Sequence, residues 1–178
     1  DAEIGGQEVS LVTGKVVYDC FGRSVTQYHP FTEDTVQYAL YNDSVTIGTA
    51  TETEYDIMDR QTYVKTPLNL VTTIEYGFDT CMGRPCFRTS VTDAMHNTMH
   101  TLTGTIGQQL KQIAPGNTVT KFEYDALGRL LRSTDPDNLS TFYTYDMAGR
   151  MVQRIHPDAG TDRYHYDPAG NLMAHVNA

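Results

Sequence analysis

The 178-residue chain lacks tryptophan, has only three cysteines and contains no long apolar run. No stretch approaches the roughly 20 apolar residues that a membrane-spanning helix needs, so we expect no membrane span. An odd number of cysteines leaves at least one unpaired within the chain, which argues against a disulfide scaffold. Glycines and prolines recur so often that they leave no room for a helix. A signal-peptide pattern is also missing, but the chain reads as an excerpt of a longer protein, so that absence carries no conclusion.

Basic residues are scarce. Lysine and arginine together number 13 against 22 aspartates and glutamates, for a formal net charge of −9. A negative balance argues against nucleic acid or an anionic membrane surface as the partner.

Threonine and tyrosine are abundant. There are 25 threonines and 12 tyrosines, and both types favour the half-buried face of a β-strand. With 39% hydrophobic residues, the chain is long enough to form one ordinary domain with a core. The composition therefore indicates a β-rich globular fold.

A Tyr-Asp-x-x-Gly-Arg phrase recurs along the chain at a fixed spacing. Its best copies are YDALGR at 124–129, YDMAGR at 145–150 and YDPAGN at 166–171. The glycines at 107, 128, 149 and 170 are each 21 residues apart, and prolines at 115, 136 and 157 each follow a glycine by eight residues. A fixed period of this length is the signature of a repeat architecture.

Looser copies extend the array toward the N-terminus, with Gly22, Asp59 and Gly83 in the glycine slot. In the copy at Gly107 the Tyr-Asp pair is eroded to Thr103 and Gly104. We therefore predict about seven units over residues 16–178, after a lead-in strand at 1–15. The first two units are 37 residues apart, so we expect an insert at 31–51 that forms a longer hairpin or loop.

Alternation at period two predicts a strand before each turn. Each tyrosine shares a face with the residue two before it, and the residues between are mostly polar. The predicted buried pairs are Val16/Tyr18, Thr53/Tyr55, Ile74/Tyr76, Phe122/Tyr124, Tyr143/Tyr145 and Tyr164/Tyr166, and the residues between are Val17, Glu54, Glu75, Glu123, Thr144 and His165. The return strands should add Val25, Cys86, Leu110, Leu131, Val152 and Met173 to the buried face, with Thr62 as the exception.

The phrase also has the chemistry of a tight turn. An aspartate at the first corner can bind the backbone two residues on, and glycine takes the positive φ that closes the loop. The arginine that follows (Arg23, Arg60, Arg84, Arg129 and Arg150) should reach back to the aspartate or lie on a tyrosine ring. A second, looser turn led by proline should follow. The expected fold is all-β, with tandem antiparallel hairpins in a curled or spiral open sheet of roughly fourteen strands.

The phrase and its spacing resemble the YD repeat of the RHS-repeat family. That family includes bacterial Rhs and wall-associated polymorphic toxins, the C subunits of Tc toxins, and the animal teneurins. The resemblance covers nearly the whole chain after residue 15, apart from the insert and the eroded copy, and is closest at 124–129, 145–150 and 166–170. It implies a ribbon of hairpins that spirals into a hollow shell. In bacterial members such a shell encapsulates a C-terminal toxin, and in teneurins it belongs to an adhesion receptor.

Two motifs suggest chemistry but have plainer explanations. The segment from Asp167 to Asn171 resembles the Asp-Pro-x-Gly motif at which family shells release their cargo by autoproteolysis, but the family has leucine where Asn171 stands. Cys81, Cys86, His96 and His100 approach a zinc-ligand spacing, with too few residues between the pairs. We interpret the first as a repeat turn, Cys86 as a core residue, and the two histidines as loop residues.

No nucleophile-base arrangement, phosphate loop or dinucleotide fingerprint is present, so the sequence predicts no catalytic residue, metal or cofactor and leaves binding residues unknown. Cys20 and Cys81 occupy comparable turn positions, which leaves a disulfide between them open. Asn42 and Asn138 fit the glycosylation pattern, which matters only in a secreted eukaryotic protein.

Two functions follow from the sequence. The first is a non-catalytic wall segment of a large secreted or cell-surface shell, whose partners are the rest of the shell and an enclosed C-terminal domain. The alternative is a module that binds carbohydrate or a cell-surface partner through tyrosine, threonine and asparagine. Unpaired edge strands should also favour pairing with a second copy of the chain.

Overall fold

The computed structural model describes residues 2–4, 7–34 and 49–177, and the regular elements in these ranges are all β-strands. They are β1 (Ala2–Ile4), β2 (Gln7–Val12), β3 (Val16–Tyr18), β4 (Ser24–Tyr28), β5 (Phe31–Asp34), β6 (Ala50–Tyr55), β7 (Gln61–Lys65), β8 (Val71–Cys81), β9 (Arg84–Thr92), β10 (Thr98–Thr103), β11 (Gln109–Ala114), β12 (Thr118–Tyr124), β13 (Leu130–Thr134), β14 (Ser140–Tyr145), β15 (Met151–His156), β16 (Gly160–Tyr166) and β17 (Leu172–Asn177). Within these ranges there is no helix with the length and apolarity to cross a membrane.

Fourteen strands of the described chain form one sheet in which neighbouring strands are also successive along the chain. The exception is β4, which pairs with β6 because β5 joins a separate small sheet in the order β1-β2-β5. β3 and β17 lie at the two edges of the large sheet, so it is open. The prediction of an all-β fold made of tandem antiparallel hairpins in an open sheet is confirmed.

The chain divides into two compact units, residues 1–74 with 91–97 and residues 75–90 with 98–178. In the first unit, the lead-in segment holds β1 and β2, which pair as a hairpin. β2 then pairs with β5, so the first four residues of the expected insert form a strand. Residues 35–48 of that insert, with Asn42, lie outside the described residues.

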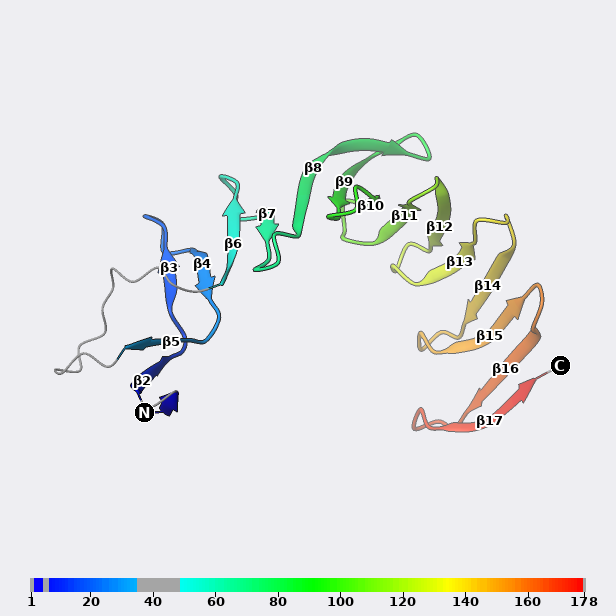
Figure 1. Cartoon of the computed structure of the whole chain (residues 1–178). Helices are drawn as coiled ribbons and strands as arrows, with labels where there is room; N and C mark the ends of the chain where they lie inside the picture. The colour runs from blue at the N-terminus through cyan, green and yellow to red at the C-terminus, as the bar shows by residue number, and fades with distance from the viewer. Residues whose placement is uncertain (1, 5–6, 35–48, 178) are drawn as a thin grey trace. The chain divides into compact units, whose positions relative to one another are not determined.

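In the second unit, β10 to β17 follow one another as successive hairpins (Figure 1). Cys81, Cys86 and Leu102 are its buried apolar residues, and Leu110 and Ile113 pack against them. Elsewhere both faces of the strands are mostly half-buried or exposed. The burial predicted for Cys86 is therefore found at the centre of the small core.

One turn geometry recurs nine times in the described part of the chain. The first residue of each turn donates its N–H to the carbonyl of the fifth, and the fourth donates to the carbonyl of the first. Gly or another residue with positive φ occupies the fourth position, as in a type I turn with a bulge. These turns are 19–23, 56–60, 66–70, 93–97, 104–108, 125–129, 135–139, 146–150 and 167–171.

The structure corrects three sequence-based predictions about turns. The proline-led turns at 66–70 and 135–139 are not looser, because Asn69 and Asn138 take the glycine slot with φ of 58° and 63°. The turn at 93–97 was missed, since His96 holds the slot there with φ of 62°. His100, predicted in a loop, lies in β10.

A further departure from prediction occurs near Gly83. Cys81 was predicted to lie in a repeat turn, but β8 continues to Cys81, and Met82 and Gly83 form a tight bend with φ of 52° and 75°. Cys81 is consequently a buried strand residue, whereas Cys20 is an exposed turn residue. The prediction that these two cysteines occupy comparable turn positions is wrong.

The alternation predicted for the first strands is found in β6, β8, β14 and β16, whereas in β12 Glu123 is half-buried like its neighbours. The motif tyrosines from β6 onward are half-buried. Tyr18 is the exception, with 61% of its surface exposed, because it lies on the edge strand β3. On the return strands, Leu131 and Met173 are 40% and 72% exposed, contrary to prediction. Met173 is exposed because β17 is an edge strand, and Leu131 lies at the register shift between β12 and β13.

Candidate functional site: arginine latches between repeats

The repeat turns are organised by their aspartates. The Asp125 carboxylate accepts the backbone N–H groups of Leu127 and Arg129 on Oδ1, both at 2.9 Å, and the Arg129 Nε on Oδ2 at 2.6 Å. The backbone N–H of Arg129, followed by its guanidinium, holds the pKa of Asp125 below its usual range. The same three bonds form at Asp19, Asp56 and Asp146.

The arginine of one repeat also binds the next repeat. Arg150 bonds its own Asp146, donates from Nη1 to the carbonyl of Asp167 at 3.0 Å, and stacks 4.9 Å from the ring centroid of Tyr166. The Tyr166 hydroxyl in turn donates to the Met151 carbonyl at 2.9 Å. One guanidinium therefore joins an aspartate of its own repeat to a tyrosine and a carbonyl of the following one.

We call this arrangement a latch, and three examples among the described residues show all of its contacts. The three latches are Arg23 on Tyr55, Arg129 on Tyr145 and Arg150 on Tyr166. In the first latch, Arg23 donates to the Asp56 carbonyl and the Tyr55 hydroxyl donates to the Ser24 carbonyl. In the second, Arg129 donates to the Asp146 carbonyl and the Tyr145 hydroxyl donates to the Leu130 carbonyl. The sequence predicted both kinds of contact for the arginine but not that the tyrosine belongs to the next repeat.

A buried ionic cluster lies in the last three strands. Asp162 in β16 is only 3% exposed, and its carboxylate binds Arg154 at 2.7 Å and His175 at 2.9 Å. The His175 ring stacks on Tyr164 with 4.7 Å between centroids. Hydrogen bonds from His175 and then from Arg154 lower the pKa of Asp162. This cluster was not predicted from the sequence, although the period of two places residue 162 on the face of Tyr164 and Tyr166.

The residues of the near-zinc spacing are not brought together as ligands. Cys81 and Cys86 belong to the apolar core, and burial raises the pKa of the Cys86 thiol. His100 bonds the Ser90 hydroxyl at 2.8 Å, and His96 occupies a turn. Over the described residues, no group of three or more His, Cys, Asp or Glu side chains is placed to hold a metal. The three cysteines are free.

The Asp-Pro-x-Gly segment at 167–171 and the glycosylation pattern at Asn138 both lie in repeat turns. The Asp167 carboxylate accepts the backbone N–H and the side-chain amide of Asn171, each at 2.8 Å. Asn171 therefore replaces the arginine of the complete motif as the partner of the aspartate. Asn138 takes the left-handed turn position.

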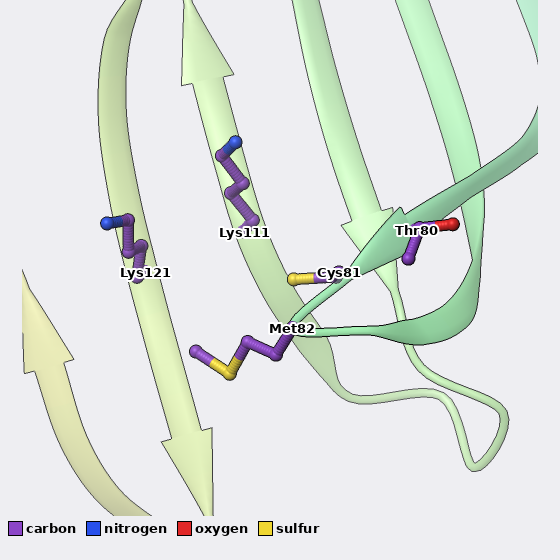
Figure 2. A pocket seen from close by; sticks show the side chains of 5 residues that line it. All are labelled: Thr80, Cys81, Met82, Lys111 and Lys121. Carbon is purple, nitrogen blue, oxygen red and sulfur yellow. The ribbon is translucent and has the colours of Figure 1, made fainter.

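A small hollow of about 250 Å³ lies beside the core, lined by Thr80, Cys81, Met82, Lys111 and Lys121. Figure 2 shows the Cys81 and Met82 side chains pointing toward the two strands that carry the lysines. Lys111 and Lys121 are directly opposite in the β11–β12 register, and like charges at such positions repel.

Comparison with known proteins finds a repeat family that matches part of the chain and solved structures with a similar fold. The RHS Repeat model matches residues 106–139 and 124–161. No curated protein matches the chain. The crystal structure of TcdB2-TccC3 matches with a TM-score of 0.71 at 20% identity, over 95% of this chain and 9% of that one. The crystal structure of TcdB2-TccC3-TEV matches with a TM-score of 0.70 at 20% identity, over 94% of this chain and 9% of that one. This chain therefore spans only about 9% of the length of these structures.

Proposed function

We propose that this chain, of which residues 106–139 and 124–161 match the RHS Repeat model, is a non-catalytic wall segment of a larger RHS-repeat shell. The observation that carries this proposal is the series of latches. Each one uses its charged and aromatic groups to join successive repeats, so these groups stabilise a continuous sheet and leave little for a substrate. Stacked repeats gain stability mainly through such nearest-neighbour interfaces.

The motif aspartates support a structural role rather than a catalytic one. A general acid or base needs a pKa near the working pH and access to a reactant. The pKa of Asp125 and that of Asp146 are instead lowered by hydrogen bonds from within the turn. Both carboxylates are already occupied by an arginine and by backbone N–H groups.

The partners of the wall are, by this proposal, the remainder of the same shell and a C-terminal domain enclosed by it, in a secreted or cell-surface protein. The similarity in fold to a small part of TcdB2-TccC3 supports this assignment. The test is limited proteolysis of the complete protein that contains this segment. We expect the enclosed domain to resist cleavage, and Arg129→Ala with Arg150→Ala to open it to protease. A domain that is cleaved equally fast in both proteins would contradict the proposal.

Carbohydrate binding remains the second candidate, and one observation favours it. Phe78 and Phe87 form an exposed aromatic pair with 5.4 Å between ring centroids. The motif tyrosines suit sugars less well, because arginines cover three of their rings. A glycan array with the wild-type chain and a Phe78→Ala/Phe87→Ala variant separates the two functions. Binding that the variant loses supports the carbohydrate module, and an array without signal supports the wall.

A further inference from the structure

One repeat in the second unit lacks its latch. In the eroded copy, Thr103 and Gly104 stand in the tyrosine and aspartate slots, and Gln108 stands in the arginine slot. The turn itself persists, since Gly104 and Gln108 make its backbone hydrogen bonds. The eroded copy therefore keeps the fold and has lost only the side chains that would hold the next repeat.

The register shows which residue has lost its partner. The pairing of Lys111 with Lys121 places Gln108 opposite Tyr124 when it is continued along both strands. The pairing of Arg132 with Phe142 places Arg129 opposite Tyr145 in the same way. Gln108 is too short and carries no charge, so it cannot supply the guanidinium that Tyr145 receives from Arg129.

Several groups at this position are left without the partners that a latch provides. Among the residues that the structure describes, none lays a cation over the Tyr124 ring or hydrogen-bonds its hydroxyl. The Asp125 carbonyl accepts the N–H of Gly128 but no arginine, so it keeps a free lone pair. The Oε1 atom of Gln108 is buried and has no hydrogen-bond partner. Buried acceptors of this kind are uncommon in folded proteins.

A hollow of about 810 Å³ occupies this place, within the roughly 300–1,000 Å³ range of ligand pockets. Gly104, Gln108, Tyr124 and Asp125 line it together with apolar side chains that include Leu110 and Phe122. A side chain at position 104 would crowd it, since a Cβ there would lie 3.1 Å from Gln108 Oε1. The hollow thus has an aromatic wall and unfilled acceptors where the other repeats hold an arginine.

We propose that this hollow binds the guanidinium of an arginine side chain supplied by another polypeptide segment. A guanidinium is planar, so it can stack on the Tyr124 ring while its N–H groups reach the Asp125 carbonyl and, once the Gln108 side chain turns outward, Gln108 Oε1. Glu123 and Asp125 also line the hollow, but their carboxylates are paired with Arg132 and Arg129, so the ring and the backbone carbonyl carry the recognition. A lysine ammonium has the charge but lacks the flat face and the spread of donors.

Arg84 is the internal competitor for this position. It lines the same hollow but is exposed, and no ion pair to it is found among the described residues. If Arg84 swings in and fills the hollow in solution, an Arg84→Ala substitution will strengthen binding of an external guanidinium. The variant therefore reports on competition without removing any group that contacts the proposed ligand.

The test is a titration of the chain with N-acetyl-arginine-N-methylamide, followed by NMR shifts of backbone amides from Phe122 to Ala126. We expect saturable shifts at millimolar concentrations of the arginine compound, and at least threefold weaker binding of the matched lysine compound. Gln108→Arg should install the internal latch and abolish the shifts. Tyr124→Leu should also abolish them, whereas Tyr124→Phe should retain most of the binding because the ring remains.

Three results would overturn the assignment: no saturable shift with wild type and none with Arg84→Ala, equal binding of the arginine and lysine compounds, or shifts that persist in Gln108→Arg. A heteronuclear NMR spectrum of each variant shows whether it is folded. If Tyr124→Leu proves unfolded, the Gln108→Arg variant alone tests whether the hollow is the binding site. The outcome does not depend on the wall proposal, since it concerns binding by the isolated chain.

Discussion

The guanidinium of Arg150 lies 4.9 Å from the ring centroid of Tyr166 while its Nε is 2.7 Å from Asp146 Oδ2. The two contacted residues belong to different repeats, so one side chain fixes the position of one hairpin relative to the next. Each latch combines a charge-assisted hydrogen bond with a cation–π contact, and both depend on the planar fork of arginine.

Removal of a latch arginine should destabilise the chain measurably. For Arg150→Ala we expect a loss of about 1–2 kcal/mol in the free energy of unfolding, from the lost hydrogen bonds and ring contact. Arg150→Lys should recover little of it, because lysine lacks the fork. Urea denaturation monitored by circular dichroism measures both. The matched control is Arg163→Ala, at an exposed position in β16, which should change the free energy by less than about 0.5 kcal/mol. Equal effects at positions 150 and 163 would contradict the latch.

The fourth position of the turn should tolerate asparagine better than alanine. Gly128 has a φ of 81°, and a Cβ there would meet nothing within 4 Å, so the cost of substitution is conformational rather than steric. We expect Gly128→Ala to cost about 1–2 kcal/mol. Gly128→Asn should cost less, because Asn69 and Asn138 already hold this position in other turns. Thermal melting temperatures rank the variants, with Asn138→Gly as a control that should not lower stability. If Gly128→Ala melted at a higher temperature than Gly128→Asn, backbone strain would not be the cause of the lost stability.

The three thiols should react in two classes. Cys20 is exposed, whereas Cys81 and Cys86 are 8% and 2% exposed. Since the thiolate is the reactive form, the raised pKa of Cys86 further slows its reaction at neutral pH. A chromogenic disulfide reagent should modify one thiol rapidly in the native chain and all three in urea. A Cys20→Ser variant should lose only the rapid phase, and prompt reaction of two or more native thiols would contradict the buried core.

Acid should loosen the last hairpin by protonating Asp162. Its pKa is lowered in the folded state, so its contribution to stability is complete above the pKa of an unfolded aspartate, about 3.9, and disappears as the pH falls through the folded value. Hydrogen exchange of amides in β16 and β17 below pH 4 should therefore accelerate. Asp162→Asn should exchange faster already at neutral pH and show a weaker acid dependence. An identical pH profile in both proteins would exclude Asp162 as the cause.

The exposed edge strand β17 should promote self-association. All six of its residues are exposed, including Leu172 and Val176, and it lies at the edge of the large sheet. Unprotected edges pair with other chains, and charged residues prevent this. We expect concentration-dependent dimers or larger species in light scattering, and a shift toward monomer in Leu172→Lys/Val176→Lys. A wild-type chain that is monomeric at all concentrations would contradict this expectation.

Much of the fold follows from local sequence patterns. The strands follow from alternation at period two, and the turns from an aspartate followed three residues later by glycine. The bend at Met82 and Gly83 was not predictable, because it places a methionine at positive φ, which local preference disfavours. His96 was missed for the same reason. Both positions hold conformations that the surrounding strand pairing selects.

The latch was only half predictable. The bond from Arg129 to Asp125 is local and follows from their spacing. Its contact with Tyr145 depends on the register between two hairpins, which is set by the turn at 135–139 rather than by the motif. Sequence spacing alone gives no such register. The hollow at Tyr124 could not be predicted for the same reason. The sequence shows that the motif at Gly107 is eroded, but only the strand register shows that Gln108 lies opposite Tyr124.

The latches also give the ribbon a direction of growth. In each of them the arginine precedes its tyrosine in the chain, by 16 residues for Arg129 and Tyr145 and likewise for Arg150 and Tyr166. During synthesis the N-terminal repeat emerges first, so the tyrosine of each latch meets an arginine that its own aspartate already holds in place. Each hairpin that carries a latch can thereby guide the docking of the hairpin that is synthesised after it.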